Sequence, residues 1–252
     1  MARHAGQKRV KRLNTPKYVQ IKKKHGKFFV KAHPGPHPKF FCLPLLHILR
    51  DILEIAHDFR EAKKLIGLGH IKIDGRVVRD VGFPVGLMDT ISIEKMDTHY
   101  RVFPDSHYGL ILHEIPEEEA AFKLCRIDGK KTVKGGHIQL NLHDGRNILI
   151  QVKDPKNPKE DTYKRMDVLK ISVPEQEVLK VLNFKENNLA LIIDGKNIGK
   201  MGTIISIKKL FGPNANTVSI EQAGVRTETL YDYTFIIGED TPEISVPEGK
   251  LE

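Results

Sequence analysis

The sequence predicts a multi-domain α+β fold in which a basic N-terminal extension precedes three small modules. Three observations lead to this prediction. The first 50 residues contain 13 of the 41 lysines and arginines and no carboxylate. Apolar residues with helical spacing are confined to residues 43–67, and the rest of the chain alternates in short strand-like runs broken by glycine. A chain of 252 residues has room for one to three modules of this kind.

The extension, residues 1–41, carries the whole excess of positive charge. The formal net charge is +9, yet the chain after residue 50 holds 28 bases against 32 acids. A cationic arm on a near-neutral body is typical of a polyanion-binding protein, because each neutralised phosphate releases counterions. The candidate cations are Arg3, Lys8, Arg9, Lys11, Arg12, Lys22, Lys23, Lys24, Lys27 and Lys31. Tyr18, Phe28, Phe29, Phe40 and Phe41 lie among them and can stack on unpaired bases.

Other interpretations of the extension are a solvated tail without a partner, a membrane-surface helix and a mitochondrial presequence. Pro16, Gly26 and the prolines of residues 33–38 break any long amphipathic helix, which argues against the membrane. Lysine dominates the charge and serine is absent, which argues against a presequence.

The first module, residues 42–104, opens with two predicted helices. Over residues 43–57, Leu45, Leu49, Ile52 and Ala56 share one helical face, and Pro44 suits a first turn. We expect a second helix to start at Asp58, with Glu61 completing a capping box, and to end at Gly67. Its core side chains would be Ala62, Leu65 and Ile66.

A basic hairpin follows the helices. Ile71 and Ile73 alternate with polar residues, and Asp74-Gly75 indicates a type I′ turn before a return strand at Val77. Helices and hairpin together predict a cationic stripe suited to structured RNA, which is recognised through backbone and shape. Its members are Arg50, Arg60, Lys63, Lys64, His70, Lys72, Arg76 and Arg79. Charges alone leave open that these are ordinary solvated residues of a small domain.

The middle segment, residues 105–173, predicts a β-rich domain. Residues 137–142 alternate strictly, residues 143–146 form a turn, and Asp128-Gly129 indicates another hairpin. His143 and Asp144 are interpreted as turn residues rather than an acid–base pair.

The third module, residues 174–240, contains two β-rich runs around a loop with Gly195, Gly199 and Gly202. It resembles a KOW motif, a small SH3-like barrel unit, with Lys196 and Lys200 on the outside of the loop. A phosphate-binding P-loop is excluded, because the spacing from Gly195 to Gly199 is one residue short and Met201 replaces the hydroxyl residue. Residues 230–238 predict a further strand, and the acidic tail, residues 241–252, is expected to be loosely ordered.

Longer stretches resemble a known family. Residues 44–93, with the runs EAKKLI, IDGRVVRD and FPVGLMDTISI, are similar to the S-four-type RNA-binding domain. With HPGPHPK before them, MARHAGQKRVKRLNTPK at the start and GGHIQLNLHDGRNI in the middle, they resemble the e-type family of small-subunit ribosomal protein four. The resemblance covers nearly the whole chain. It implies a cytoplasmic structural constituent of the small ribosomal subunit, with rRNA and neighbouring small-subunit proteins as partners.

The sequence predicts no catalytic residue, cofactor, metal, small-molecule substrate or membrane partner. His33, His37 and Cys42 suggest zinc, but Pro-Gly-Pro separates the histidines rigidly and no second cysteine is near. Two function classes compete with a ribosomal protein. A pseudouridine-synthase type of enzyme needs a catalytic domain of roughly 150 residues or more, for which room is lacking. A KOW-containing transcription factor leaves the basic extension and first module unexplained.

Overall fold

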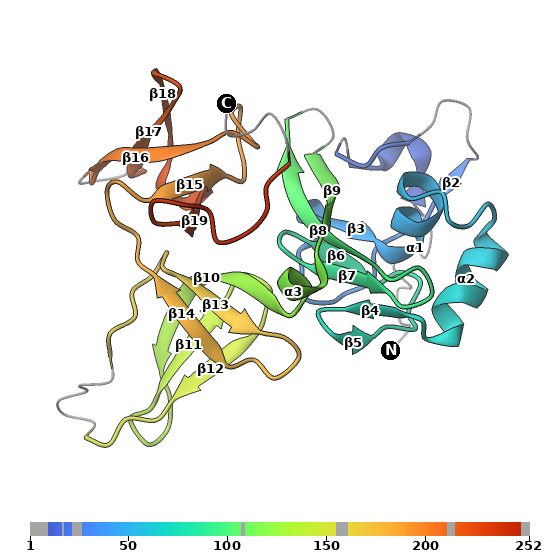
Figure 1. The fold of residues 1–252 in the computed structure, drawn as a ribbon, viewed down its shortest axis with the longest axis horizontal. Helices are drawn as coiled ribbons and strands as arrows, with labels where there is room; N and C mark the ends of the chain where they lie inside the picture. The colour runs from blue at the N-terminus through green and yellow to red at the C-terminus, as the bar shows by residue number, and fades with distance from the viewer. Residues whose placement is uncertain are drawn as a thin grey trace, which may run out of the picture.

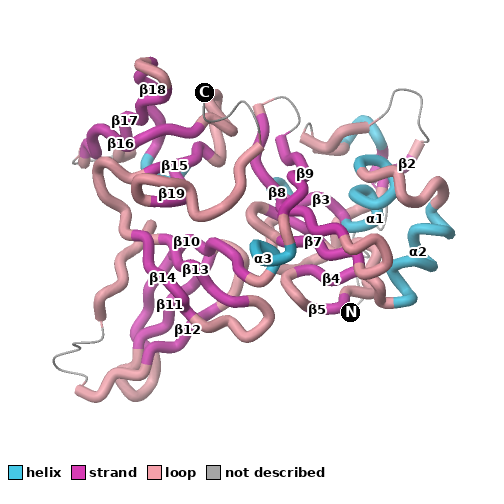
Figure 2. The backbone as a smooth tube through the Cα atoms, viewed as in Figure 1, coloured by secondary structure: helices cyan, strands magenta, loops and turns pink. Residues whose placement is uncertain are grey.

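β-Strand is the commonest secondary structure of the described chain, and most of its strands form three five-stranded antiparallel sheets, with helices beside the first (Figures 1 and 2). The computed structural model describes residues 10–16, 18–21, 27–106, 109–154, 161–210 and 215–247. Within these ranges, no helix has the length and apolar character that crossing a membrane requires. The β-rich, multi-module part of the predicted α+β class is therefore confirmed.

The first sheet has the order β5-β4-β7-β8-β9. Its strands are β4 (Ile71–Ile73), β5 (Arg76–Val77), β7 (Thr90–Ile93), β8 (Thr98–Asp105) and β9 (Gly109–Ile115). The helices α1 (Leu45–His47) and α2 (Phe59–Leu68) bury Leu45, Ala62 and Ile66 in one core with the strand residues Ile71, Ile91 and Val102. This core fixes the helices against the sheet.

The helix predicted over residues 43–57 is shorter than expected. Pro44 closes the strand β3 (Cys42–Pro44), which pairs with β6 (Pro84–Gly86), so it precedes α1 instead of lying in its first turn. After α1 the chain makes one π-helical turn, Ile48–Ile52, and Glu54 adopts a positive φ of 52°, which ends the helix. The segment Leu45–Leu49 is buried all round, so the pairing of β3 and the surrounding core override the local helical periodicity.

The second helix follows the prediction at its start and differs at its end. Asp58 occupies the N-cap position without a capping hydrogen bond, and Glu61 accepts a hydrogen bond from the backbone N–H of His57 (2.9 Å) instead. The helix runs past Gly67 to Leu68, and Gly69 ends it in the left-handed conformation (φ 82°). The prediction that Gly67 ends the helix is wrong, because Gly69 is the glycine that adopts the left-handed C-cap conformation.

The central sheet has the order β12-β11-β10-β13-β14. Its strands are β10 (Phe122–Thr132), β11 (Ile138–Leu142), β12 (Asn147–Ile150), β13 (Val168–Ser172) and β14 (Val178–Leu182). The alternation in β11 is confirmed, since its first, third and fifth residues are buried. The hairpin predicted at Asp128-Gly129 is wrong: β10 passes through it with a register shift, and the chain turns at residues 133–136. A bulge and a turn share the same preference for Asp and Gly.

The third sheet has the order β18-β17-β16-β15-β19. Its strands are β15 (Leu189–Ile192), β16 (Met201–Lys208), β17 (Thr217–Gln222), β18 (Val225–Leu230) and β19 (Thr234–Gly238). The two β-rich runs are confirmed as β15 and β16, but Gly202, expected in the loop between them, lies in β16 opposite Ala190. The strand predicted over 230–238 is interrupted, because Tyr231–Tyr233 forms a 3-10 turn before β19.

The described part of the acidic tail, residues 241–247, packs against the body. Ile244 is only 3% exposed, and the Ser245 N–H donates to both carboxylate oxygens of Glu119 (3.1 and 3.0 Å) in α3 (Glu117–Ala120). The Glu243 carboxylate also accepts hydrogen bonds from Lys170 (2.9 Å) and Lys180 (2.6 Å). The expectation of loose order is therefore wrong for these residues, since one apolar side chain and a few tertiary ion pairs hold them.

Two glycines with opposite surroundings give a stability test. A Cβ at Gly202 would lie 2.2 Å from the carbonyl oxygen of Glu221, whereas a Cβ at Gly67 in α2 would meet nothing within 4 Å. We expect Gly202→Ala to destabilise the chain by roughly 1–3 kcal/mol, because the backbone of the third sheet must shift. Gly67→Ala should stabilise it by about 0.5–1 kcal/mol. Urea unfolding of both variants checks this, and equal effects would contradict it.

Candidate nucleic-acid interface

The exposed face of α2 carries three cations. Arg60, Lys63 and Lys64 are all exposed, while Ala62 and Ile66 of the same helix are fully buried. The helical period therefore separates a core face from a cationic face, as predicted.

The β4–β5 hairpin brings more positive charge to the end of this helix. Asp74 and Gly75 both have positive φ (48° and 72°), which confirms the type I′ turn, and Arg76 beside the turn is exposed. Beyond it, exposed Arg79 lies over the C-terminus of α2: a Cβ at Gly69 would be 3.6 Å from its Nε and Nη2 atoms. A guanidinium there also interacts favourably with the helix dipole. We call Arg60, Lys63, Lys64, Arg76 and Arg79 the cationic ridge.

Lys72 and His70 lie on the same sheet but share a carboxylate. The Lys72 ammonium is 2.7 Å from the Glu94 carboxylate, and the His70 ring is 4.0 Å from it. The hydrogen bond from Lys72 lowers the pKa of Glu94. The charge of Lys72 is thus partly neutralised, and His70 faces the same carboxylate, which the sequence pattern did not indicate.

Arg50 lies in an internal ion pair. Its guanidinium donates to both carboxylate oxygens of Asp51 (2.9 and 2.6 Å), and the buried His47 ring lies 2.7 Å from the same carboxylate. Burial alone would raise the pKa of Asp51, but the hydrogen bonds from His47 and Arg50 lower it below its usual range. Among the cations predicted for the stripe, Arg50 is the least available to a phosphate.

Two strands within the extension lie side by side. The strands β1 (Val10–Lys11) and β2 (Phe28–Phe29) pair antiparallel, and the Arg12 N–H donates to the Lys27 carbonyl (3.1 Å). Lys11 and Lys27 are exposed, and Arg12 and Lys31 are partly buried. Six predicted cations lie outside the described residues: Arg3, Lys8, Arg9, Lys22, Lys23 and Lys24.

The rest of the described extension is anchored to the first module. Phe29 is buried with its ring 4.9 Å from that of His47, and Val19 joins the same core. His33 Nδ1 lies 2.8 Å from the Asp80 carboxylate, and His37 Nε2 lies 2.9 Å from that of Asp89. Each histidine therefore has its own aspartate partner, which favours a tether over zinc ligation.

Lys196 and Lys200 lie apart from the cationic ridge. Both are exposed in the loop between β15 and β16. In Figure 1 these strands are on the left of the molecule and α2 is on the far right. The structure therefore does not bring these lysines together with the ridge.

A buried ionic cluster, which the sequence reasoning missed, joins the first module to the central sheet. The Lys123 ammonium hydrogen-bonds to Asp74 (2.9 Å), Asp144 (3.1 Å) and Asp89. Arg146 adds contacts to Asp74 (2.7 Å) and Asp144 (3.2 Å). The side chains of Lys123 and of its three aspartate partners are each at most 7% exposed. The only local signal was a lysine within the apolar run of residues 122–127.

The protonation states in the cluster do not favour catalysis. Burial alone would lower the pKa of Lys123, but Asp74 and Asp89 raise it well above its ordinary value. The amine therefore stays protonated at neutral pH and cannot act as a nucleophile. His143 has a pKa lowered to about 4, chiefly by burial and then by Lys123, so its ring is neutral.

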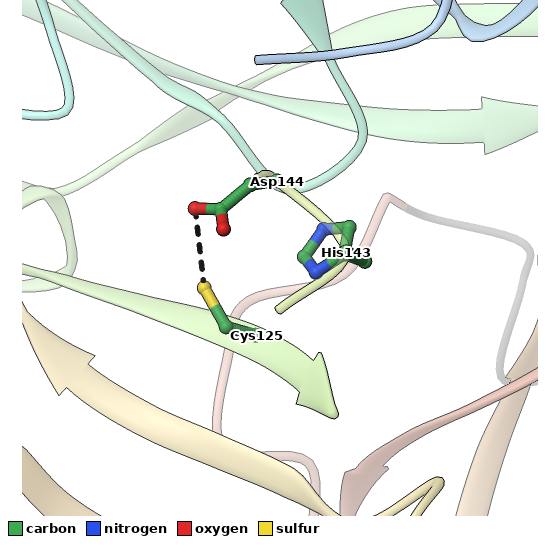
Figure 3. Close-up of side chains that lie close together, drawn as sticks. All are labelled: Cys125, His143 and Asp144. Carbon is green, nitrogen blue, oxygen red and sulfur yellow. Dashed lines mark hydrogen bonds between the residues drawn. The ribbon is translucent and has the colours of Figure 1, made fainter. Parts of the chain in front are cut away.

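Cys125, His143 and Asp144 lie close enough together to suggest a metal site (Figure 3). Their donor atoms are already engaged. The Cys125 thiol donates to Asp144 (3.5 Å), and Nδ1 of His143 accepts from the Arg126 N–H (3.2 Å). Burial raises the pKa of the thiol well above its ordinary value, so the thiolate that a metal needs is disfavoured. With the Lys123 ammonium on the same carboxylate, the site fits a protonated network rather than a cation.

Comparisons with known proteins agree with this picture. Three family models match: "Ribosomal family S4e" over residues 96–178, "RS4NT (NUC023) domain" over 5–39 and "S4 domain" over 57–91. The chain is 48% identical over 250 residues to "Small ribosomal subunit protein eS4" of Aeropyrum pernix, and 50% identical to the protein of that name from Staphylothermus marinus. In both comparisons 99% of each chain is covered. The crystal structure of the 30S ribosomal protein S4e from Thermoplasma acidophilum is similar with a TM-score of 0.66 and 33% identity, covering 79% of this chain and 95% of that one.

Proposed function

The chain belongs to the S4e family of ribosomal proteins, and from this premise we propose that it binds small-subunit rRNA through the cationic ridge and the N-terminal extension. It is a structural component of the small ribosomal subunit and not an enzyme. Its partners are accordingly rRNA and other ribosomal proteins. The proposal concerns which residues make these contacts.

The observation that carries the proposal is the composition of the ridge. Five exposed cations from one helix and one hairpin form it: Arg60, Lys63, Lys64, Arg76 and Arg79. Glu61 lies within α2, but its carboxylate turns back to the backbone of His57. A cationic surface without a base-reading pattern suits duplex RNA, whose backbone and shape are the accessible features. Lys72 and Arg50 make weaker contacts in this proposal, because carboxylates already share their charge, and His70 does so because its ring faces the Glu94 carboxylate.

The extension supplies the second surface. Four of its described cations, Lys11, Arg12, Lys27 and Lys31, lie in or beside the β1–β2 pair, and the exposed Phe28 ring (50%) lies there as a stacking surface. Six cations outside the described residues are assigned to the same contact: Arg3, Lys8, Arg9, Lys22, Lys23 and Lys24. Binding by both surfaces derives its free energy from phosphate neutralisation.

We also propose a division of the whole chain into five segments. The segments are the extension (1–41), the S4-type domain (42–104), the β-rich central domain (105–173), an SH3-like KOW unit (174–240) and the tail (241–252). The five-stranded antiparallel order of the third sheet and its glycine loop support the KOW assignment, with Lys196 and Lys200 as a separate RNA contact. The two cysteines, both free and buried, are consistent with a cytoplasmic particle.

Salt dependence tests the electrostatic basis of the proposal. We expect the full chain to bind deproteinised small-subunit rRNA with a steep negative slope of log K against log salt. Deleting residues 1–9, which hold Arg3, Lys8 and Arg9, should make that slope shallower by about 2, because each phosphate contact contributes roughly 0.7–0.9. Filter binding at several salt concentrations measures both slopes. A slope near zero for the full chain would refute the proposal.

A further inference from the structure

A large cavity opens where the three sheets meet, away from the cationic ridge. Its volume is about 500 Å³, and its walls include Phe41, Leu110, Ile193, Ile198 and Tyr233. They come from the extension, from β9 of the first sheet, and from the loop after β15 and the turn before β19 of the third sheet, while Arg126 and Asp128 of β10 add the central sheet. The volume lies within the ~300–1,000 Å³ that is typical of ligand-sized sites. Since the walls are mostly apolar, the cavity fits an apolar side chain.

Three carboxylates, those of Asp128, Asp194 and Asp232, line the same cavity. The Asp128 and Asp232 side chains are 45% and 63% exposed, so both face water. Arg126 is the only Lys or Arg among the described lining residues. Its guanidinium is used internally, donating to the Asp128 carboxylate (2.8 Å) and to the carbonyls of Asp232 (2.7 Å) and Thr234 (3.1 Å).

The charge at this cavity is opposite to that of the proposed RNA surfaces. Arg165 also pairs with Asp232 (3.2 Å), but both side chains are more than 60% exposed, so water screens this contact. The lining retains more negative than positive charge. At the lining itself a phosphate backbone would be repelled, whereas a cationic peptide would be attracted. Lys196 and Lys200, exposed in the same loop as Asp194, are not among the lining residues.

We propose that this cavity, the acidic docking cavity, binds an extended segment of a neighbouring small-subunit protein. The segment inserts one apolar side chain between Phe41, Ile198 and Tyr233. Its flanking lysines or arginines lie over Asp128, Asp194 and Asp232. The proposal rests on the chain's place in the small subunit, and it does not depend on which residues of the ridge touch RNA.

Site-specific photocrosslinking in assembled small subunits tests the occupant. p-Benzoylphenylalanine replaces Tyr233 in the full chain, and the crosslinked partner is sequenced by mass spectrometry. We expect a ribonuclease-resistant adduct to another ribosomal protein, at an apolar residue within three positions of a lysine or arginine. Crosslinks to RNA, to this chain, to a second copy or to a segment without a nearby cation would overturn the proposal, as would the absence of any adduct.

The same probe at exposed Phe59 beside the ridge separates this inference from the proposed function. Phe59 begins α2 and is 47% exposed, so its probe should crosslink to rRNA. An RNA adduct at Phe59 without a protein adduct at Tyr233 rejects the docking cavity alone. A protein adduct at Tyr233 without an RNA adduct at Phe59 rejects the ridge alone.

Peptide binding to the isolated full chain tests whether the cavity needs both an apolar side chain and flanking cations in its ligand. The probes are fluorescein-labelled acetyl-Lys-Lys-Leu-Lys-Lys-amide and its analogue with serine in place of leucine. We expect the leucine peptide to bind at least fivefold more tightly, and Asp128→Asn with Asp194→Asn to weaken it at least fivefold. The matched pair Glu117→Gln with Glu118→Gln, on exposed residues of α3, should leave binding unchanged. Equal binding of the two peptides, or equal effects of the two double variants, would overturn the proposal.

Discussion

Replacing Lys123 by methionine is expected to destabilise the folded chain by about 3–5 kcal/mol. Methionine keeps an unbranched stem of similar length but removes the ammonium group. The carboxylates of Asp74, Asp89 and Asp144 then remain buried without their shared cation. Among the described residues, Arg146 reaches Asp74 and Asp144 but not Asp89, which loses its lysine and keeps His37 and the Gly86 N–H as partners. Equilibrium unfolding in urea measures the loss.

Lys208→Met provides the matched control. Lys208 also pairs with a carboxylate, that of Glu228 (2.9 Å), but both side chains are more than half exposed. Its removal should cost less than about 1 kcal/mol. If the two lysine variants lost the same stability, burial of the cluster would not be what makes Lys123 important.

The free energy of unfolding of Lys123→Met should change with acidification in the opposite direction to that of the parent chain. Although burial alone would raise them, the pKa values of Asp89 and Asp144 are lowered, chiefly by Lys123. Such groups stabilise the parent above about pH 4, and this stability is lost as the pH falls through their folded pKa values. In the variant, burial without the lysine raises the pKa of Asp89 above its unfolded value, whereas Asp144 keeps the Arg146 guanidinium at 3.2 Å. Protonation of the carboxyl group then favours the folded variant. The difference in unfolding free energy between the parent and Lys123→Met should therefore shrink from pH 7 to pH 4.

Features that depend on neighbouring residues in sequence were predictable. The Asp74-Gly75 turn, the alternation in β11 and the exposure of Arg60, Lys63 and Lys64 follow from local backbone geometry and periodicity. Local sequence patterns gave wrong predictions where two different backbone features favour the same residue types. Asp128-Gly129 suits a bulge as well as a turn, and Gly67 and Gly69 are equivalent in sequence until the helix axis is fixed.

The charge balance of the site depended on distant residues. Glu94, which partly neutralises Lys72, is 22 positions away and becomes its neighbour only when β4 pairs with β7. Lys123 lies 49 positions from Asp74, and turn signals give no hint that the two will meet. Sequence therefore indicated which residues are cationic, while the tertiary structure decided which of those cations are left for a partner.

The available cations define the second large expected effect. The triple variant Arg60→Glu, Lys64→Glu, Arg76→Glu should weaken rRNA binding by about 3 kcal/mol or more, since each contact with phosphate contributes about 1 kcal/mol or more. This corresponds to a loss of more than about a hundredfold in affinity. All three side chains are exposed, so the fold should survive, and circular dichroism checks this.

A control with the same change in net charge separates a specific surface from general attraction. Lys131→Glu, Lys185→Glu and Arg226→Glu replace exposed cations on the central sheet, on the segment before β15 and on β18. Long-range electrostatics falls off over about 10 Å at 0.1 M salt, so this variant should bind rRNA nearly as the parent does at that ionic strength. The ridge variant should also show a shallower salt slope, by about 0.7–0.9 for each cation lost, because its phosphates are no longer neutralised. If both triple variants bound equally weakly and with the same slope, net charge alone would explain binding and the ridge would not be the RNA surface.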